Sequence, residues 1–217
     1  MLNLFVIILA ALLLPALLYG EKRENTGIIL PFKTALSALF IAAVLIQSHH
    51  IPQYYTFLLA GLILCLCGDV FLALPWEKMF LLGLISFLLG HVSYIFAFFS
   101  AGLIGPLSWA GAVVVLVAGC VVFFWLKPHL GAMKIPVLLY VIVISVMFCG
   151  AVSVFGNPGL DLWGRIFVII GAAFFYISDI FVARDRFLKQ EFTNRLFGLP
   201  LYYLGQFLFA FSAGLLK

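Results

Sequence analysis

CLCGDVFLA, residues Cys65–Ala73, places a single aspartate, Asp69, inside an otherwise apolar run. FYISDIFVA, residues Phe175–Ala183, repeats the pattern around Asp179. In both, a small residue precedes the aspartate, and a β-branched aliphatic residue, a phenylalanine, another aliphatic residue and an alanine follow it. A carboxylate inside hydrocarbon is costly, so two of them in matching surroundings indicate a functional site within a membrane.

The composition of the whole chain is that of a polytopic membrane protein. Of its 217 residues, 66% are hydrophobic and 9% are charged, which is far from the composition of soluble domains. A hydrocarbon core about 30 Å thick needs roughly 20 apolar residues per helix. Continuous rather than alternating apolar runs predict helices, so the expected fold is all-α and not a β-barrel. The eight predicted transmembrane segments are Leu2–Tyr19, Phe32–Gln47, Phe57–Leu74, Met79–Ser100, Leu107–Leu126, Ile135–Val154, Leu162–Val182 and Leu196–Leu216.

Nearly the whole chain is therefore predicted to lie in the bilayer, as one integral membrane domain covering residues 1–217. The first segment is too long for a removable signal peptide, and it lacks the basic leader and the small-residue cleavage site of one. We expect no soluble domain to carry the function.

The net charge of +4 is distributed unevenly along the chain. Ten of the twelve lysines and arginines fall at the connections that follow odd-numbered segments, and only Arg165 and Lys217 fall at the other side. The positive-inside rule therefore predicts a plasma-membrane (inner-membrane) protein with those connections in the cytoplasm and both termini outside. The charges are not interleaved with aromatic residues as in a nucleic-acid-binding protein, so we expect no nucleic-acid partner and interpret them as membrane anchors.

Segments three and four resemble segments seven and eight. Gly61 precedes Asp69 by eight residues, as Gly171 precedes Asp179, and Leu89-Gly90-His91 has a weaker counterpart in Leu204-Gly205-Gln206. Because the copies are four segments apart, they run in the same direction. The chain is thus predicted to be a parallel four-plus-four repeat, with halves of about 1–105 and 106–217.

Depth in the membrane follows from the helical rise of about 1.5 Å per residue. Asp69 and Asp179 lie near the ends of their predicted segments, within roughly 5–8 Å of the cytoplasmic boundary. Lys33 and Tyr203 open their own segments near the same layer. His91 lies about twelve residues into its segment, and we expect it roughly 10 Å deeper than Asp69.

Two acids close together in a low dielectric cannot both stay ionised comfortably, so we expect one of them to hold its proton. An acid paired with a base is the arrangement that splits acetals and related ethers. The alternative is a structural role, in which each aspartate caps a neighbouring helix or pairs with Lys33 or Arg186.

A set of polar, aromatic and glycine positions runs in a characteristic order from the second segment to the eighth. It comprises Phe32-Lys33, Gly68-Asp69, Gly83, Phe87, Gly90-His91, Tyr94, Gly171, Phe175, Ser178-Asp179, Arg186-Phe187, Tyr202-Tyr203 and Gln206. In this order and spacing the chain resembles the YhhN family of eight-helix membrane proteins, whose animal members are lysoplasmalogenases. Thr34 departs from the pattern, because the family usually has proline after the lysine.

The resemblance implies hydrolysis of the vinyl-ether bond at the first glycerol carbon of a lysoplasmalogen, with Asp69 and Asp179 as the active site. We expect no metal or other cofactor. Lys33 and Arg186 are predicted to hold the head-group phosphate at the cytoplasmic rim, and the substrate to enter from the inner leaflet. The other predicted substrate-binding residues are His91, Tyr94, Ser178, Tyr203 and Gln206.

Three alternatives stay open at this point. A transporter or lipid-binding protein would place polar residues at both membrane faces, whereas here the ionisable groups crowd one side. A hydrolase of another lysolipid would use the same site. A zinc enzyme could use His91, Asp69 and Asp179, but their unequal depths disfavour it, since ligands lie about 2 Å from the ion. The oligomeric state is not predicted.

Overall fold

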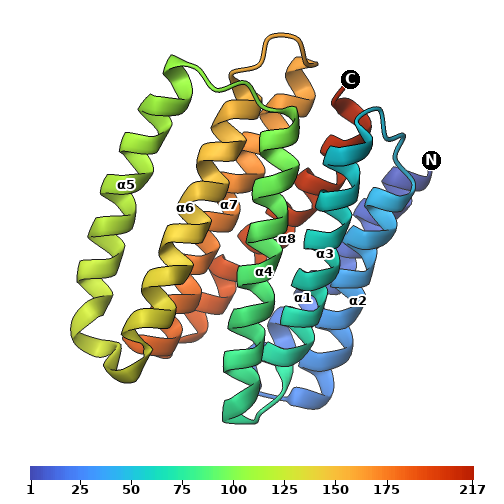
Figure 1. The fold of residues 1–217 in the computed structure, drawn as a ribbon. Helices are drawn as coiled ribbons and strands as arrows, with labels where there is room; N and C mark the ends of the chain where they lie inside the picture. Colours follow the sequence, from blue (N-terminus) through green and yellow to red (C-terminus); the bar gives the residue numbers. More distant parts are fainter.

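The computed structural model describes residues 1–217, apart from the side chain of Glu77, and the described backbone forms eight α-helices (Figure 1). All eight are long and apolar enough to cross a membrane. The predicted all-α fold and the predicted number of membrane-length helices are confirmed. The helices are α1 (Leu2–Lys22), α2 (Thr26–Leu45), α3 (Pro52–Ala73), α4 (Glu77–Ala101), α5 (Pro106–Leu126), α6 (Lys134–Phe155), α7 (Leu162–Phe187) and α8 (Phe192–Leu215).

Helix α2 begins earlier than the hydropathy pattern predicts. Its first residue is Thr26 and not Phe32, because the Asn25 side chain accepts a hydrogen bond of 3.0 Å from the Gly27 amide and caps the helix. Pro31 therefore lies inside the helix instead of opening it.

The connection between α7 and α8 is also shorter than predicted, since α7 continues through its basic run to Phe187. Arg184 on this last turn donates a 2.9 Å hydrogen bond to Glu191, the residue that precedes α8. The ammonium of Lys189, and after it the guanidinium of Arg184, hold the pKa of the Glu191 carboxyl below its usual value. Charge pairing across the turn thus keeps both helix ends ordered beyond the apolar segments.

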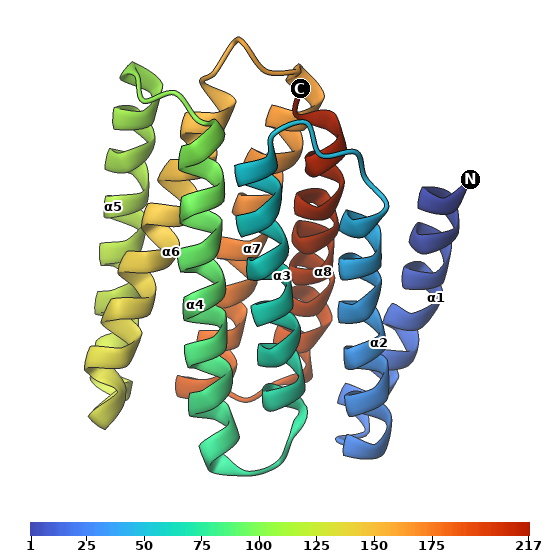
Figure 2. The ribbon, with the colours of Figure 1, turned by 45° about the vertical axis from the view of Figure 1, so that its right-hand side comes forward.

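Both termini lie at the same end of the bundle, together with the α2–α3, α4–α5 and α6–α7 connections (Figures 1 and 2). The other four connections lie at the opposite end. Ten of the twelve basic residues belong to these four connections and the helix ends beside them, so we call this the basic end of the bundle. Which membrane face it occupies stays a prediction.

The order of helix neighbours is the same in the two halves of the chain. Helix α1 packs on α2 as α5 packs on α6, the α3–α4 and α7–α8 hairpins are the most extensive pairs, and α4 contacts α6 as α8 contacts α2. Helices α1 and α5 consequently lie at the two outer edges (Figure 2). A parallel repeat predicts this order. The repeat and the single domain of residues 1–217 stay predictions.

Within each of the two hairpins, α3–α4 and α7–α8, glycines let the backbones of the two helices approach closely. A Cβ atom on Gly90 would lie 3.3 Å from the carbonyl oxygen of Gly61, and one on Gly205 would lie 2.9 Å from the carbonyl oxygen of Gly171. Small residues at such crossings let membrane helices pack by van der Waals contact where lipid gives no hydrophobic drive. The two hairpins thus use glycines at the positions matched in the sequence.

We expect Gly90→Val and Gly205→Val each to lower the thermal unfolding temperature of the detergent-solubilised protein. Overpacking of this kind costs about 1–3 kcal/mol. Gly105→Ala is the control, because no atom lies within 4 Å of the Cβ it would add. Unchanged unfolding temperatures for both valine variants would show that the helix crossings have more room than these Cβ distances indicate.

Candidate active site

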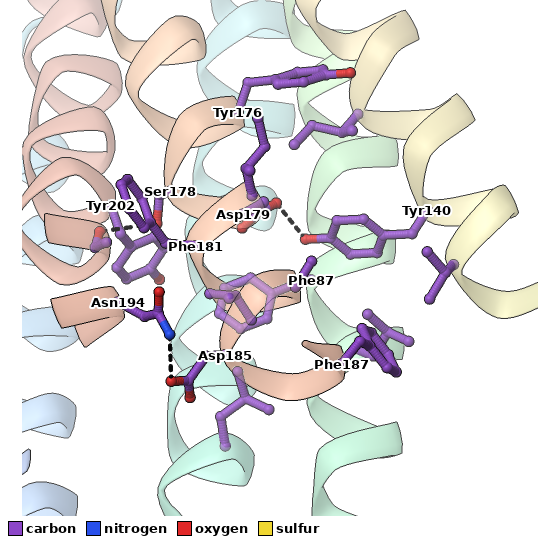
Figure 3. A pocket seen from close by; sticks show the side chains of 18 of the residues that line it. Phe87, Tyr140, Tyr176, Ser178, Asp179, Phe181, Asp185, Phe187, Asn194 and Tyr202 are labelled. Carbon is purple, nitrogen blue, oxygen red and sulfur yellow. Dashed lines mark hydrogen bonds between the residues drawn. The ribbon is translucent and has the colours of Figure 1, made fainter. Parts of the chain in front are cut away.

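A single cavity near the basic end contains both aspartates in its wall. Residues from seven helices, α2 to α8, line it, and most of them are aliphatic or aromatic. The space between its walls, counting the open side, is about 1110 Å³. Figure 3 shows Asp179 inside it, with Asp185 and Phe187 toward the end of α7. The cavity can hold an apolar chain beside two carboxyl groups.

Asp69 on α3 is held by three donors. The Ser37 hydroxyl lies 2.5 Å and the Tyr202 hydroxyl 2.6 Å from Oδ2, and the Lys33 ammonium lies 3.6 Å from Oδ1. The Asp69 and Lys33 side chains are 1% and 4% exposed. A cation and two hydrogen bonds to its oxygens stabilise the negative charge of a buried carboxylate.

Asp179 on α7 has different partners. The Tyr140 hydroxyl donates a 2.7 Å hydrogen bond to its Oδ2, as Figure 3 shows, and His91 Nε2 lies 3.3 Å from the same oxygen and 2.9 Å from the Tyr140 hydroxyl. The Asp179 side chain is 18% exposed, whereas His91 is fully buried. Asp179 is thus the more open of the two acids and carries no lysine or arginine among its described partners.

The partners of the two acids come from corresponding helices but differ in chemistry. Asp69 on α3 is contacted from α2 and α8, and Asp179 on α7 from α6 and α4. Among the described residues no hydrogen bond joins the two carboxyl groups directly. That one of them holds its proton therefore stays a prediction, but their surroundings already make them unequal.

A chain of hydrogen bonds lies behind Asp69. Tyr94 donates to the Gln206 side-chain oxygen at 2.7 Å, and the Gln206 amide donates to the Tyr202 hydroxyl at 3.3 Å. Tyr203 donates to the Lys33 carbonyl oxygen at 3.3 Å. Tyr94, Tyr203 and Gln206, predicted as substrate-binding residues, are absent from the described cavity wall and instead support the residues that hold Asp69.

His91 is also absent from the described cavity wall, but it reaches Asp179. This contradicts the expectation that it lies in a deeper layer than both acids. The estimate was wrong because α7 ends at Phe187 and not Val182, which places Asp179 about 12 Å from the helix end at 1.5 Å per residue. Among the described residues, no group of three His, Cys, Asp or Glu side chains is placed to hold a metal ion.

Three other predicted residues have distinct places. Ser178 lines the cavity, and its hydroxyl donates to the Gly198 carbonyl oxygen at 3.0 Å, which ties α7 to α8. Arg186 lies outside the cavity with its guanidinium 4.3 Å from the Phe80 ring centre. Lys33 is buried against Asp69, and this burial disagrees with its predicted role at the rim.

Three residues that contact the acids were not among the predicted site residues, namely Ser37, Tyr140 and Tyr202. Ser37 follows Lys33 by four positions, so it shares the face of α2 that points at Asp69, and this spacing could have revealed it. Tyr140 has no counterpart to that spacing. No spacing links it to Asp179, because their contact depends on how α6 is rotated against α7.

Comparison with known proteins places this geometry in a family. The model of the YhhN family matches residues 28–213, a range that contains both acids and every partner described for them. The chain belongs to the YhhN family.

Curated proteins similar to this YhhN chain carry consistent names. "Lysoplasmalogenase" from Mycobacterium bovis is 31% identical over 193 residues, which are 85% of this chain and 69% of that protein. "Lysoplasmalogenase TMEM86A" from Homo sapiens is 31% identical over 160 residues, 73% of this chain and 65% of that protein. "Lysoplasmalogenase homolog" from Dictyostelium discoideum is 26% identical over 206 residues, 77% of this chain and 66% of that protein. The chain thus spans about two thirds of the length of these relatives. No solved structure matches it.

We expect Lys33→Met to destabilise the protein strongly, because removal of one partner of a buried ion pair leaves an unpaired charge and costs about 3–5 kcal/mol. Adding Asp69→Asn to this variant removes the charge and should restore most of the lost stability, without activity. Thermal unfolding in detergent measures both effects.

Lys134→Met is the matched control. Lys134 lies at the start of α6, just as Lys33 lies near the start of α2, but the Lys134 side chain is exposed. Equal stability of Lys33→Met and the parent protein would mean that the Lys33–Asp69 pair does not hold the α2–α3 contact.

Proposed function

We propose that this protein is a membrane-embedded hydrolase that cleaves the vinyl-ether bond of a lysoplasmalogen, an alkenyl glycerophosphoethanolamine or glycerophosphocholine. The products are a fatty aldehyde and a glycerophospho-base. The observation that carries the proposal is the pair of carboxyl groups with unlike surroundings in the wall of one apolar cavity. The names of the YhhN relatives support the same activity.

The two acids take different parts in the proposed mechanism. Asp69, with a lysine and two hydroxyl donors, serves as the ionised carboxylate that stabilises positive charge. Asp179, more open to the cavity and without a cationic lysine or arginine partner, serves as the general acid. Unlike surroundings let an enzyme use two residues of one type, one as the acid and the other as the base.

The reaction then proceeds by ordinary vinyl-ether chemistry. Asp179 gives its proton to the β-carbon of the double bond, and the α-carbon becomes an oxocarbenium ion beside the Asp69 carboxylate. A water molecule adds to the α-carbon and returns a proton to Asp179. The resulting hemiacetal breaks its bond to the glycerol oxygen, which takes the hydroxyl proton, and releases the aldehyde. One water is consumed and no cofactor is required.

The residues behind the acids act as positioning residues in this proposal. His91 and Tyr140 fix the rotamer of Asp179 through its Oδ2, which leaves its other oxygen outside these two contacts. Gln206 orients the Tyr202 hydroxyl that binds Asp69. Buried side chains locked by such hydrogen bonds hold reacting groups within the narrow tolerance that catalysis requires.

We expect Asp69→Asn and Asp179→Asn each to lower the rate of aldehyde release from alkenyl glycerophosphoethanolamine by about 100-fold or more, the usual contribution of general acid–base catalysis. Mass spectrometry of lysolipid mixtures incubated with purified protein measures aldehyde and fatty acid in the same sample. Asp161→Asn is the matched control, since Asp161 caps α7 at the other end of the bundle and asparagine caps equally well.

Two results would contradict this assignment. Undiminished aldehyde release by both variants would remove the acids from the mechanism. Fatty-acid release without aldehyde would favour a hydrolase of acyl lysolipids at the same site.

The proposed orientation places the basic end, and with it the active site, at the cytoplasmic leaflet of the plasma membrane, because the positive-inside rule sets topology from short loops. We expect a membrane-impermeant maleimide to label Gly105→Cys, in the α4–α5 connection, in intact cells. Lys189→Cys, in the α7–α8 connection, should react only after the membrane is permeabilised. The reverse pattern would invert the topology.

A further inference from the structure

A second, polar hollow opens beside the active-site cavity at the basic end of the bundle. We call it the vestibule and define it by the side chains of Trp76, Phe80, Asp185, Arg186, Gln190 and Arg195. Phe80, Asp185 and Arg195 also line the cavity that contains the two acids. The two spaces therefore lie side by side, with these three side chains between them.

Arg195 is held in place at the junction of the two spaces. Its Nη2 lies 2.8 Å from Asp185 Oδ2, and its Nε lies 3.8 Å from Glu21. The other Asp185 oxygen accepts a 3.0 Å hydrogen bond from the Asn194 side chain. Residues from α1, α7 and α8 thus fix this guanidinium and orient it before any ligand arrives.

Arg186 is held differently. Its guanidinium stacks over the Phe80 ring at 4.3 Å, which fixes the plane of the group while the N–H donors at its edge stay available. A planar guanidinium matches two oxygens of a phosphate at once, and stacking on an aromatic ring is compatible with that contact. The vestibule therefore presents one oriented and one stacked guanidinium at the basic end of the bundle.

The spacing between the vestibule and the acids matches the proposed substrate. Arg186 follows Asp179 by seven residues on the same helix, which is about 10 Å at 1.5 Å per residue. Seven bonds separate the phosphorus of a lysoplasmalogen from the β-carbon of its vinyl ether. An extended chain covers roughly 3.5 Å for every three bonds, or roughly 8 Å in total, and the arginine side chain accommodates the difference.

From this match we infer that the vestibule binds the phosphate of the lysolipid head group through Arg186 and Arg195, and that this contact sets which bond lies between Asp69 and Asp179. The inference rests on the proposed function and adds a head-group requirement to it. It also transfers to Arg195 the phosphate contact that the sequence predicted for Lys33. A lipid without phosphate lacks this anchor and slides along the apolar cavity.

The test compares two substrates that share the same vinyl ether, an alkenyl glycerophosphoethanolamine and an alkenylglycerol without phosphate. We expect Arg186→Gln to raise KM for the phosphate substrate by roughly 10- to 100-fold, the loss typical of a hydrogen bond between charged groups. The kinetic constants for alkenylglycerol should not change. Arg186→Lys keeps the charge without the planar fork and should give an intermediate KM. Arg195→Gln is expected to act in the same direction.

Lys189→Gln is the matched control, because it removes one positive charge from the neighbouring loop without belonging to the vestibule. A second readout does not depend on catalysis, namely the rise in unfolding temperature on adding acyl lysophosphatidylethanolamine, which Arg186→Gln should reduce. An equal loss for both vinyl ethers, or an unchanged preference and an unchanged temperature shift, would overturn the inference. Absence of aldehyde from every substrate, with the temperature shift still lost in Arg186→Gln, would reject the proposed reaction and retain the phosphate site.

Discussion

The buried ion pair between Lys33 and Asp69 is the constraint on which the rest of the structure depends. Both side chains are almost inaccessible, and an unpaired charge at this depth would be too costly to retain. Their pairing fixes α2 against α3, and the Tyr202 hydroxyl on the same carboxylate brings α8 to both. Because α8 packs on α7, this arrangement also positions the helix that carries the second acid. The Lys33–Asp69 contact thus both holds one of the two acids in place and fixes the packing of the helices around the site.

Hydropathy alone predicts the number of helices correctly, because each span needs a continuous apolar run and little else. The helix ends of α2, α7 and α8 were predicted less well. Asn25 starts α2 through a cap, and the Arg184–Glu191 pair extends α7 and α8 past their apolar segments. Such ends depend on single polar contacts, some of them between residues on different helices, to which a window average is insensitive.

The residues of the site that could be predicted from the sequence are mainly those that belong to the repeated Asp-centred pattern. Asp69 and Asp179 stand out because two costly residues share one sequence frame, and Lys33 because it was expected near the depth of Asp69, with which it pairs. Tyr140 and the inward role of Gln206 escaped notice, since the rotation of each helix about its axis decides which polar side chains meet. The contact between His91 and Asp179 illustrates the same limit, because an error of five residues at the end of α7 was enough to place Asp179 in a shallower layer than His91.

The order of the partners along the chain bears on how the protein is made. Membrane helices are synthesised from the N-terminus onward, and each acid follows at least one of its partners. Lys33 and Ser37 precede Asp69, and His91 and Tyr140 precede Asp179. When each carboxyl group enters the bilayer, at least one of its polar partners has therefore already been synthesised. Only the contact from Tyr202 arrives afterwards, so docking of α8 completes the site as the last step of biogenesis.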